Sequence, residues 1–229
     1  MAGKFNVSSS PHVRDNSSTA NIMKDVCIAM IPTLAFGCFQ FGLSALIVAI
    51  CTVLACVLAE YLYEKVMNKP VTIGDFSAVV TGLILALNMP PQIPVWMPIL
   101  GGVFAIIVVK QLYGGLGQNF MNPALAARCF MLISFAGSMT NFSSVAMNYD
   151  SSSTPTPLAF LKAKGITDAL EQYNLVNIFL GRIPGTIGEV STIALLIGAI
   201  YLVVRKVISL RIPVIYIATV AVFVFLFGD

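Results

Sequence analysis

Long apolar blocks alternate with short polar breaks along most of this chain. Residues 26–43 and 44–63 form two blocks of about 18–20 residues, the length that a helix needs to cross a bilayer core of roughly 30 Å. Pro32 lies inside the first block, and Glu60 and Glu64 mark the end of the second. The pattern therefore predicts two membrane-spanning helices near the start of the chain.

The next three apolar segments are shorter or interrupted. They comprise residues 76–87, 95–109 and 121–135, and proline or glycine lies inside or beside each of them. Broken helices expose backbone polar groups, which are tolerated at membrane depth only when they are buried in protein or face a cavity. Such segments mark cofactor, ion or substrate sites in many transporters. Kinks that serve only packing are the alternative.

A long polar stretch, residues 138–190, separates these segments from two further apolar blocks that begin near residues 190 and 213. The chain therefore divides into a polar N-terminal arm, a first membrane region, a polar loop and the start of a second membrane region. These parts are residues 1–24, 25–137, 138–190 and 191–229. The expected fold class is an all-α polytopic membrane protein.

Composition supports this class. Hydrophobic residues make up 58% of the chain and charged residues only 10%, whereas a soluble domain carries about 25% charged residues. The mean hydropathy is +0.90. The net charge of +3 is too small and too dispersed for nucleic-acid binding. We therefore expect the lipid bilayer, and no nucleic acid, as a partner.

The sequence offers little for a metal site. All five cysteines lie inside apolar runs without a CxxC pair, which is typical of small buried hydrophobic residues. The single histidine, His12, lies in the polar arm. We expect no metal or iron–sulfur ligation by this chain alone.

The distribution of lysine and arginine predicts the orientation. With the N-terminus in the cytoplasm, nine basic residues fall at cytoplasmic ends and three fall in the long outer loop, where the rule counts them less. The nine are Lys4, Arg14, Lys24, Lys65, Lys69, Lys110, Arg205, Lys206 and Arg211, and the three are Lys162, Lys164 and Arg182. This places residues 138–190 outside the cytoplasm.

The stretch at residues 114–135, GGLGQNFMNPALAARCFMLISF, is the clearest candidate for a site in the membrane. Its glycines permit tight turns, and Asn119 and Asn122 offer amide donors and acceptors. Asn122 is placed to cap a helix that begins at Pro123. Arg128 follows inside an apolar helix, where a charge usually faces a partner or a polar cavity. An arginine that extends outward to the interface is the alternative.

Two carboxylates precede apolar segments. Asp75 follows Gly74, and Glu189 follows Gly188. Either could bind an ion or a proton near the membrane face. We favour the simpler interpretation, in which each carboxylate stabilises the N-terminus of a helix.

Four separated blocks resemble the RnfD family in order. They are SPHVRDNSSTANIMKDVCIAMIP, GDFSAVVTGLILALNMPPQIPVW, KQLYGGLGQNFMNPALAARCFMLISF and GRIPGTIGEVSTIALLIGAIYLVVRK, and they cover essentially the whole chain. RnfD is the D subunit of the ion-translocating ferredoxin:NAD oxidoreductase and is related to the B subunit of the sodium-pumping NADH:quinone reductase. The resemblance implies an inverted-repeat architecture of two times five helices. We expect residues 25–137 to be the first repeat and the second repeat to be incomplete in this stretch.

The family also carries FMN, linked through its phosphate to threonine in a sequence like D-x-x-S-G-A-T-P-L. Residues 150–158 read DSSSTPTPL, so the resemblance assigns Asp150 and Ser153 to the motif and Thr156 to the flavin. Thr154 and Pro155 replace the glycine and alanine of the pattern, which leaves Thr154 as a second attachment candidate. Without the family, the same stretch is typical of a Ser/Thr/Pro linker.

The resemblance implies a membrane flavoprotein subunit that is not catalytically complete alone. Ferredoxin oxidation and NAD reduction would be coupled to Na⁺ or H⁺ translocation, with ferredoxin and NAD bound by other subunits that carry iron–sulfur and flavin groups. We expect covalent FMN at Thr156, a second non-covalent flavin (riboflavin) or the coupling ion among the broken segments, and cofactor contacts from Asn119, Asn122 and Arg128. The location would be a bacterial cytoplasmic membrane, with the FMN loop outside.

Two other functions fit the pattern without the resemblance. Broken helices, asparagines and an arginine within the membrane would also serve a channel or secondary transporter for a small polar solute or ion. A structural anchor for redox partners is a third possibility, and it explains the interrupted segments poorly.

Overall fold

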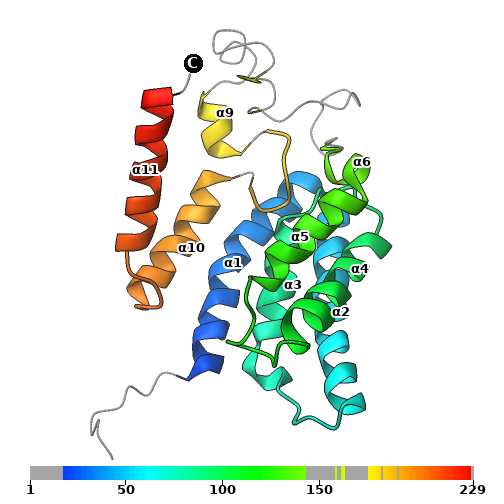
Figure 1. Ribbon diagram of the computed structural model, residues 1–229. Coiled ribbons are helices and arrows are strands. Elements are labelled where there is room, and N and C mark those ends of the chain that lie inside the picture. Colours follow the sequence, from blue (N-terminus) through cyan, green and yellow to red (C-terminus); the bar gives the residue numbers. More distant parts are fainter. Residues whose placement is uncertain are drawn as a thin grey trace, which may run out of the picture.

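The computed structural model describes residues 18–142, 158, 161–162, 175–181, 183–189 and 191–227 of the chain. Every regular element in this described part is a helix (Figure 1), which confirms the all-α prediction. The principal helices are α1 (Thr19–Phe41), α2 (Leu43–Val66), α3 (Ser77–Leu87), α4 (Trp96–Phe104), α5 (Pro123–Ser134), α10 (Thr192–Val204) and α11 (Arg211–Phe227). Shorter elements are η1 (Ile73–Asp75), η2 (Ala105–Gln111), α6 (Ala136–Met139) and α9 (Leu175–Leu180).

The first two helices confirm the two predicted spans. Both are long and apolar enough to cross a membrane. α1 begins earlier than its apolar block, because the Ser18 hydroxyl accepts a hydrogen bond from the backbone N–H of Asn21 and caps the helix. It continues through Pro32 and ends at Phe41. The capping residue Gly42 has a φ of 75°, which lets the chain turn into α2.

The middle helices are short, as the sequence predicts. α3 has 11 residues and packs against α2 and α1, while α4 continues directly into η2. η2 is a π-helix of seven residues. Gly82 permits the close packing of α3 on α2, because a Cβ there would lie 2.8 Å from Val53 Cα.

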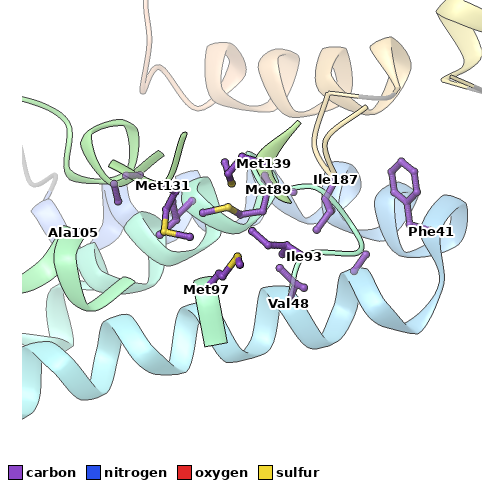
Figure 2. Packing of buried hydrophobic residues seen from close by; sticks show 14 residues of the cluster. Phe41, Val48, Met89, Ile93, Met97, Ala105, Met131, Met139 and Ile187 are labelled. Carbon is purple, nitrogen blue, oxygen red and sulfur yellow. The ribbon is translucent and has the colours of Figure 1, made fainter. Parts of the chain in front are cut away.

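Methionines fill much of the core between these short helices. Figure 2 shows Met89, Met97, Met131 and Met139 close together, with Ile93 and Val48 beside them. Methionine is unbranched and adaptable, so it fills the irregular space that broken helices leave. Ile187, from the distant segment before α10, completes one end of this core.

α10 lies along α1, and α11 follows α10 at the edge of the molecule (Figure 1). Gly198 makes the first contact possible, because a Cβ at this position would lie 2.3 Å from the Ala29 carbonyl oxygen. Across the same interface, Arg205 and Tyr201 donate hydrogen bonds to the Asp25 carboxylate. α11 has no buried residue.

The segment before α10 is anchored by backbone hydrogen bonds to the end of α3. The N–H of Ile187 donates to the Met89 carbonyl at 3.1 Å, and the N–H of Gly188 donates to the Leu87 carbonyl at 2.8 Å. These bonds satisfy backbone groups that the short α3 leaves unpaired. A distant part of the chain is thereby fixed beside the broken helices.

Large apolar side chains cover the outside of the helices, including Leu54 and Leu58 on α2 and Phe225 on α11. A soluble protein rarely exposes apolar surface on this scale. Such a surface suits lipid, and the predicted class of polytopic membrane protein is confirmed.

Candidate functional site

A buried ion pair lies inside the helix bundle. The Lys110 ammonium is 2.6 Å from Glu60 Oε1, and the side chains are 2% and 0% exposed. Lys110 belongs to η2 and Glu60 to α2, so the pair joins the π-helix to the second long helix. Ionisable residues at membrane depth are costly and usually mark a functional site.

A hydrogen-bonded network extends from this pair toward the end of α2. Gln111 donates to Glu60 Oε1 at 2.8 Å and to Glu64 Oε1 at 3.2 Å. Glu64 in turn accepts hydrogen bonds from the backbone N–H and the hydroxyl of Thr72. Because Thr72 is exposed, this polar network runs from the surface to the buried pair.

The network also reaches the start of α3. Lys110 donates to Ser77 Oγ at 2.5 Å, and Asp75 Oδ1 accepts hydrogen bonds from the Ser77 backbone N–H and hydroxyl. Asp75 therefore stabilises the N-terminus of α3, which confirms the simpler of its two predicted roles. With Glu60, Glu64 and Asp75 facing one lysine, carboxylates outnumber ammonium groups in the network.

The π-helix places two consecutive polar side chains inside the bundle. Lys110 and Gln111 are 2% and 3% exposed. π-helical turns are rare and occur often at functional sites. The orientation count treats Lys110 as a charge at a cytoplasmic helix end, but its side chain is enclosed and paired.

A polar cavity of about 450 Å³ adjoins the ion pair. Ser77, Thr81 and Lys110 contribute from one side, and Asn119 and Asn122 contribute from the loop before α5. The remaining lining residues are apolar: Met23, Val80, Ile84, Leu116, Met121 and Pro123. Asn119 Oδ1 is buried and accepts no hydrogen bond among the described residues, so a donor in the cavity would satisfy it.

The loop between η2 and α5 has the predicted geometry. Gly114, Gly115 and Gly117 all have positive φ values, which a side chain would disfavour. Asn122 Oδ1 accepts hydrogen bonds from the backbone N–H groups of Ala124 and Leu125, and this confirms it as the cap of α5.

Arg128 lies away from this cavity. Its guanidinium donates to Asn88 Oδ1 at 2.6 Å and lies 3.5 Å from Glu189 Oε1. The arginine therefore has partners inside the protein, which agrees with the first predicted alternative and not with an arginine that extends outward to the interface. Asn88 and Glu189 line a second, mostly apolar cavity of about 400 Å³ between α1, α3 and α10.

Glu189 does not stabilise a helix N-terminus in the way we expected. α10 begins at Thr192, and the Ser191 hydroxyl caps it by accepting from the Ala194 N–H. The Glu189 side chain is 57% exposed and turns toward Arg128 instead.

Asn119 and Asn122 thus line the same cavity, as predicted, and Arg128 does not line it. Sequence reasoning missed Glu60, Glu64, Lys110 and Gln111 as members of one site. Two signals could have found them: Glu60 and Glu64 are four residues apart on one face of an apolar helix, and Lys110 ends an apolar segment. Asp150, Ser153, Thr154, Pro155, Thr156 and His12 lie outside the described residues.

Comparison with known proteins matches nearly the whole chain to one family. The model of the NQR2, RnfD, RnfE family matches residues 6–229. The D subunit of the Na⁺-translocating ferredoxin:NAD⁺ oxidoreductase complex of Acetobacterium woodii is 50% identical over 226 residues, which are 97% of this chain and 70% of that protein. The D subunit of the proton-translocating ferredoxin:NAD⁺ oxidoreductase complex of Clostridium ljungdahlii is 44% identical, over 98% of this chain and 70% of its own length. The D subunit of the ion-translocating oxidoreductase complex of Escherichia fergusonii is 35% identical, over 95% of this chain and 71% of its own.

Proposed function

The chain belongs to the NQR2, RnfD, RnfE family, and from this premise we propose that it is the membrane-embedded D subunit of an ion-translocating complex that couples electron transfer from ferredoxin to NAD⁺. The observation that carries the proposal is the 50% identity to such a subunit over 97% of this chain. The polytopic helical fold supports it, because ion translocation requires a protein that spans the bilayer.

The protein acts as one component of the complex. Its sequence holds no cysteine cluster for iron–sulfur ligation and no glycine-rich nucleotide motif, so other subunits bind ferredoxin and NAD⁺. Its own contribution is to hold flavin within and beside the membrane.

We propose that Thr156 carries FMN through a phosphate ester. The motif of residues 150–158 supports this assignment, with Asp150 and Ser153 beside the attachment point. A phosphate linkage leaves the flavin ring free, so the protein can tune the redox potential of the flavin by packing and hydrogen bonding.

Flavin fluorescence on a denaturing gel tests the attachment. The chain is co-expressed with a flavin transferase and compared with Thr156→Ala and Thr154→Ala variants. We expect fluorescence in the parent and in Thr154→Ala, and none in Thr156→Ala. Fluorescence that persists in Thr156→Ala and disappears in Thr154→Ala would move the linkage by two residues.

We further propose that the polar cavity holds a second, non-covalent flavin. Its volume of about 450 Å³ falls within the range of roughly 300–1,000 Å³ that is typical of cofactor sites. Five polar and six apolar side chains line it, which suits a flat ring with polar edges. The buried Asn119 Oδ1 would accept from a ring N–H or ribityl hydroxyl, and Lys110 and Asn122 would contact its acceptors.

Extraction of flavin after denaturation tests this second site. Thr156→Ala protein, purified within its complex, should still release one flavin in addition to those that the other subunits carry. Adding Asn119→Leu should remove that flavin, because the leucine fills the cavity and offers no acceptor. Gln118→Leu, an exposed neighbour that does not line the cavity, should leave the flavin bound. Flavin retention in both variants would exclude the cavity.

The orientation is also a proposal. We place the N-terminus in the cytoplasm and the FMN loop outside a bacterial cytoplasmic membrane. In a variant without native cysteines, Lys162→Cys should react with an impermeant maleimide in whole cells, whereas Lys69→Cys should react only after lysis. The reverse pattern would invert the topology.

A further inference from the structure

We propose that Lys110 links the charge in the polar cavity to the protonation of Glu60. When the cavity gains a negative charge, the Lys110 ammonium turns toward it, and Glu60 takes up a proton in its place. The inference rests on the proposed second flavin, which would bring electrons into the cavity.

The geometry places Lys110 between the two sites. Its ammonium contacts both Glu60 and Ser77, and Ser77 and Lys110 line the cavity whereas Glu60 does not. A lysine side chain has a flexible four-carbon stem, so a compact charge can move between neighbouring acceptors. No other ammonium or guanidinium group contacts Glu60 in the described part of the chain.

Glu60 depends on Lys110 for its charge balance. The charged and titratable groups that face it are Lys110 from η2, Asp75 from η1, and Glu64 and Cys56 from its own helix. Lys110 is the only cation among them. Glu60 Oε2 is buried and has no hydrogen-bond partner among the described residues. A buried carboxylate that loses its cation takes up a proton, because isolated charge in a low-dielectric interior is too costly.

Charge balances in the proposed step. One electron, supplied by reduced ferredoxin through the neighbouring subunits, adds one negative charge to the cavity. One proton, supplied by water at the exposed Thr72 end of the network, binds Glu60 and forms an O–H bond on its carboxylate. The net charge of the buried region is then unchanged, and oxidation reverses both transfers.

Infrared difference spectroscopy of the purified complex tests the link. The Thr156→Ala background removes the covalent flavin of this chain, and dithionite reduces the complex. Subtracting the spectrum of the Thr156→Ala/Asn119→Leu complex removes the contribution of the other subunits. We expect reduction to produce the carbonyl band of a protonated carboxylic acid, sensitive to exchange into D₂O. The band should disappear in Glu60→Gln. It should also disappear in Lys110→Met, where the carboxyl is protonated before reduction.

Two further variants keep the result interpretable. The double variant Lys110→Met/Glu60→Gln removes both charges, so it should fold and lack the band. Glu60→Gln alone leaves the cavity lining unchanged, so it should retain flavin and lack the band. A control pair, Asp25→Asn/Arg205→Met, removes an ion pair outside the cavity and should keep the band. Equal band intensity at low and high Na⁺ is expected, and a response that follows Na⁺ instead of pH would overturn proton uptake.

The outcomes separate this inference from the site on which it depends. If the Thr156→Ala complex releases no flavin beyond that of the other subunits, the second flavin is wrong and the link fails with it. If flavin is present and reduction produces no Glu60 band, the link alone is overturned, while the flavin site stands.

Discussion

The ammonium of Lys110 lies 2.6 Å from the carboxylate of Glu60, in a part of the bundle where both side chains are almost fully enclosed. The two residues are 50 positions apart and come from different helices. Removing charges from water is costly, and Gln111 and Ser77 reduce that cost here by contributing further hydrogen bonds. The pair therefore ties α2, η2 and α3 to one arrangement.

Replacing only one partner should destabilise the protein strongly. Glu60→Gln alone leaves the Lys110 ammonium buried without its carboxylate, and we expect a loss of about 3–5 kcal/mol. Lys110→Met leaves a protonated Glu60 without its partner and should lose less. Lys110→Met/Glu60→Gln should recover most of the larger loss, because it strands no charge. Thermal unfolding of the purified proteins in detergent ranks the variants by their unfolding midpoints. A loss in the double variant equal to the sum of the two single losses would show that the pair contributes no coupling.

We expect Asn122 to stabilise the protein through its side-chain oxygen, which caps α5, and not through its amide nitrogen. Asn122→Ala removes the acceptor for two backbone N–H groups and should cost about 1 kcal/mol. Asn122→Asp keeps an acceptor at the positive end of the helix and should cost little. Unfolding midpoints of the two variants test this. A similar loss for Asp and Ala would mean that the amide nitrogen, rather than the cap, matters at this position.

Sequence alone predicted the helices well where the length of an apolar block, a proline or a capping residue defines them. Two spans followed from block length, the short α3 followed from Pro90-Pro91, and the α5 start followed from Asn122-Pro123. The beginning of α1 was missed, because its first turns are polar and only the Ser18 cap marks them.

The candidate site was harder to predict, because its key contacts are tertiary. Glu60 and Lys110 look like ordinary helix-end charges when each is taken with its sequence neighbours. Arg128 and Glu189 are 61 positions apart, and nothing local indicates that they meet. Asn119 and Asn122 could be predicted together because they are only three positions apart in one glycine-rich loop.

Small residues at two helix crossings give a third prediction. Gly82→Ala would place a Cβ 2.8 Å from the Val53 backbone, and Gly198→Ala would place one 2.3 Å from the Ala29 carbonyl. Neither backbone can move easily, so each variant should lose about 1–3 kcal/mol through overpacking.

Gly137→Ala is the matched control for these variants. Nothing lies within 4 Å of a Cβ at that position, and Gly137 is also helical. We expect no loss there, and at most a gain of about 1 kcal/mol from helix propensity. The three unfolding midpoints provide the comparison, and an equal loss at all three positions would contradict the assigned crossings.

The two contacts of Arg128 should differ in strength. Its hydrogen bond to Asn88 is short, at 2.6 Å, whereas its ion pair with Glu189 is 3.5 Å long and the Glu189 side chain is 57% exposed. A double-mutant cycle of Arg128→Met with Asn88→Ala should give a coupling of about 1.5–3 kcal/mol, as for hydrogen bonds to charged groups. The cycle with Glu189→Gln should give about 0–1 kcal/mol and weaken further in salt, as expected for an exposed pair. Asn88 also donates to the Ile84 carbonyl, and the cycle cancels that separate loss. A larger coupling to Glu189 than to Asn88 would show that the arginine is held chiefly by the segment before α10.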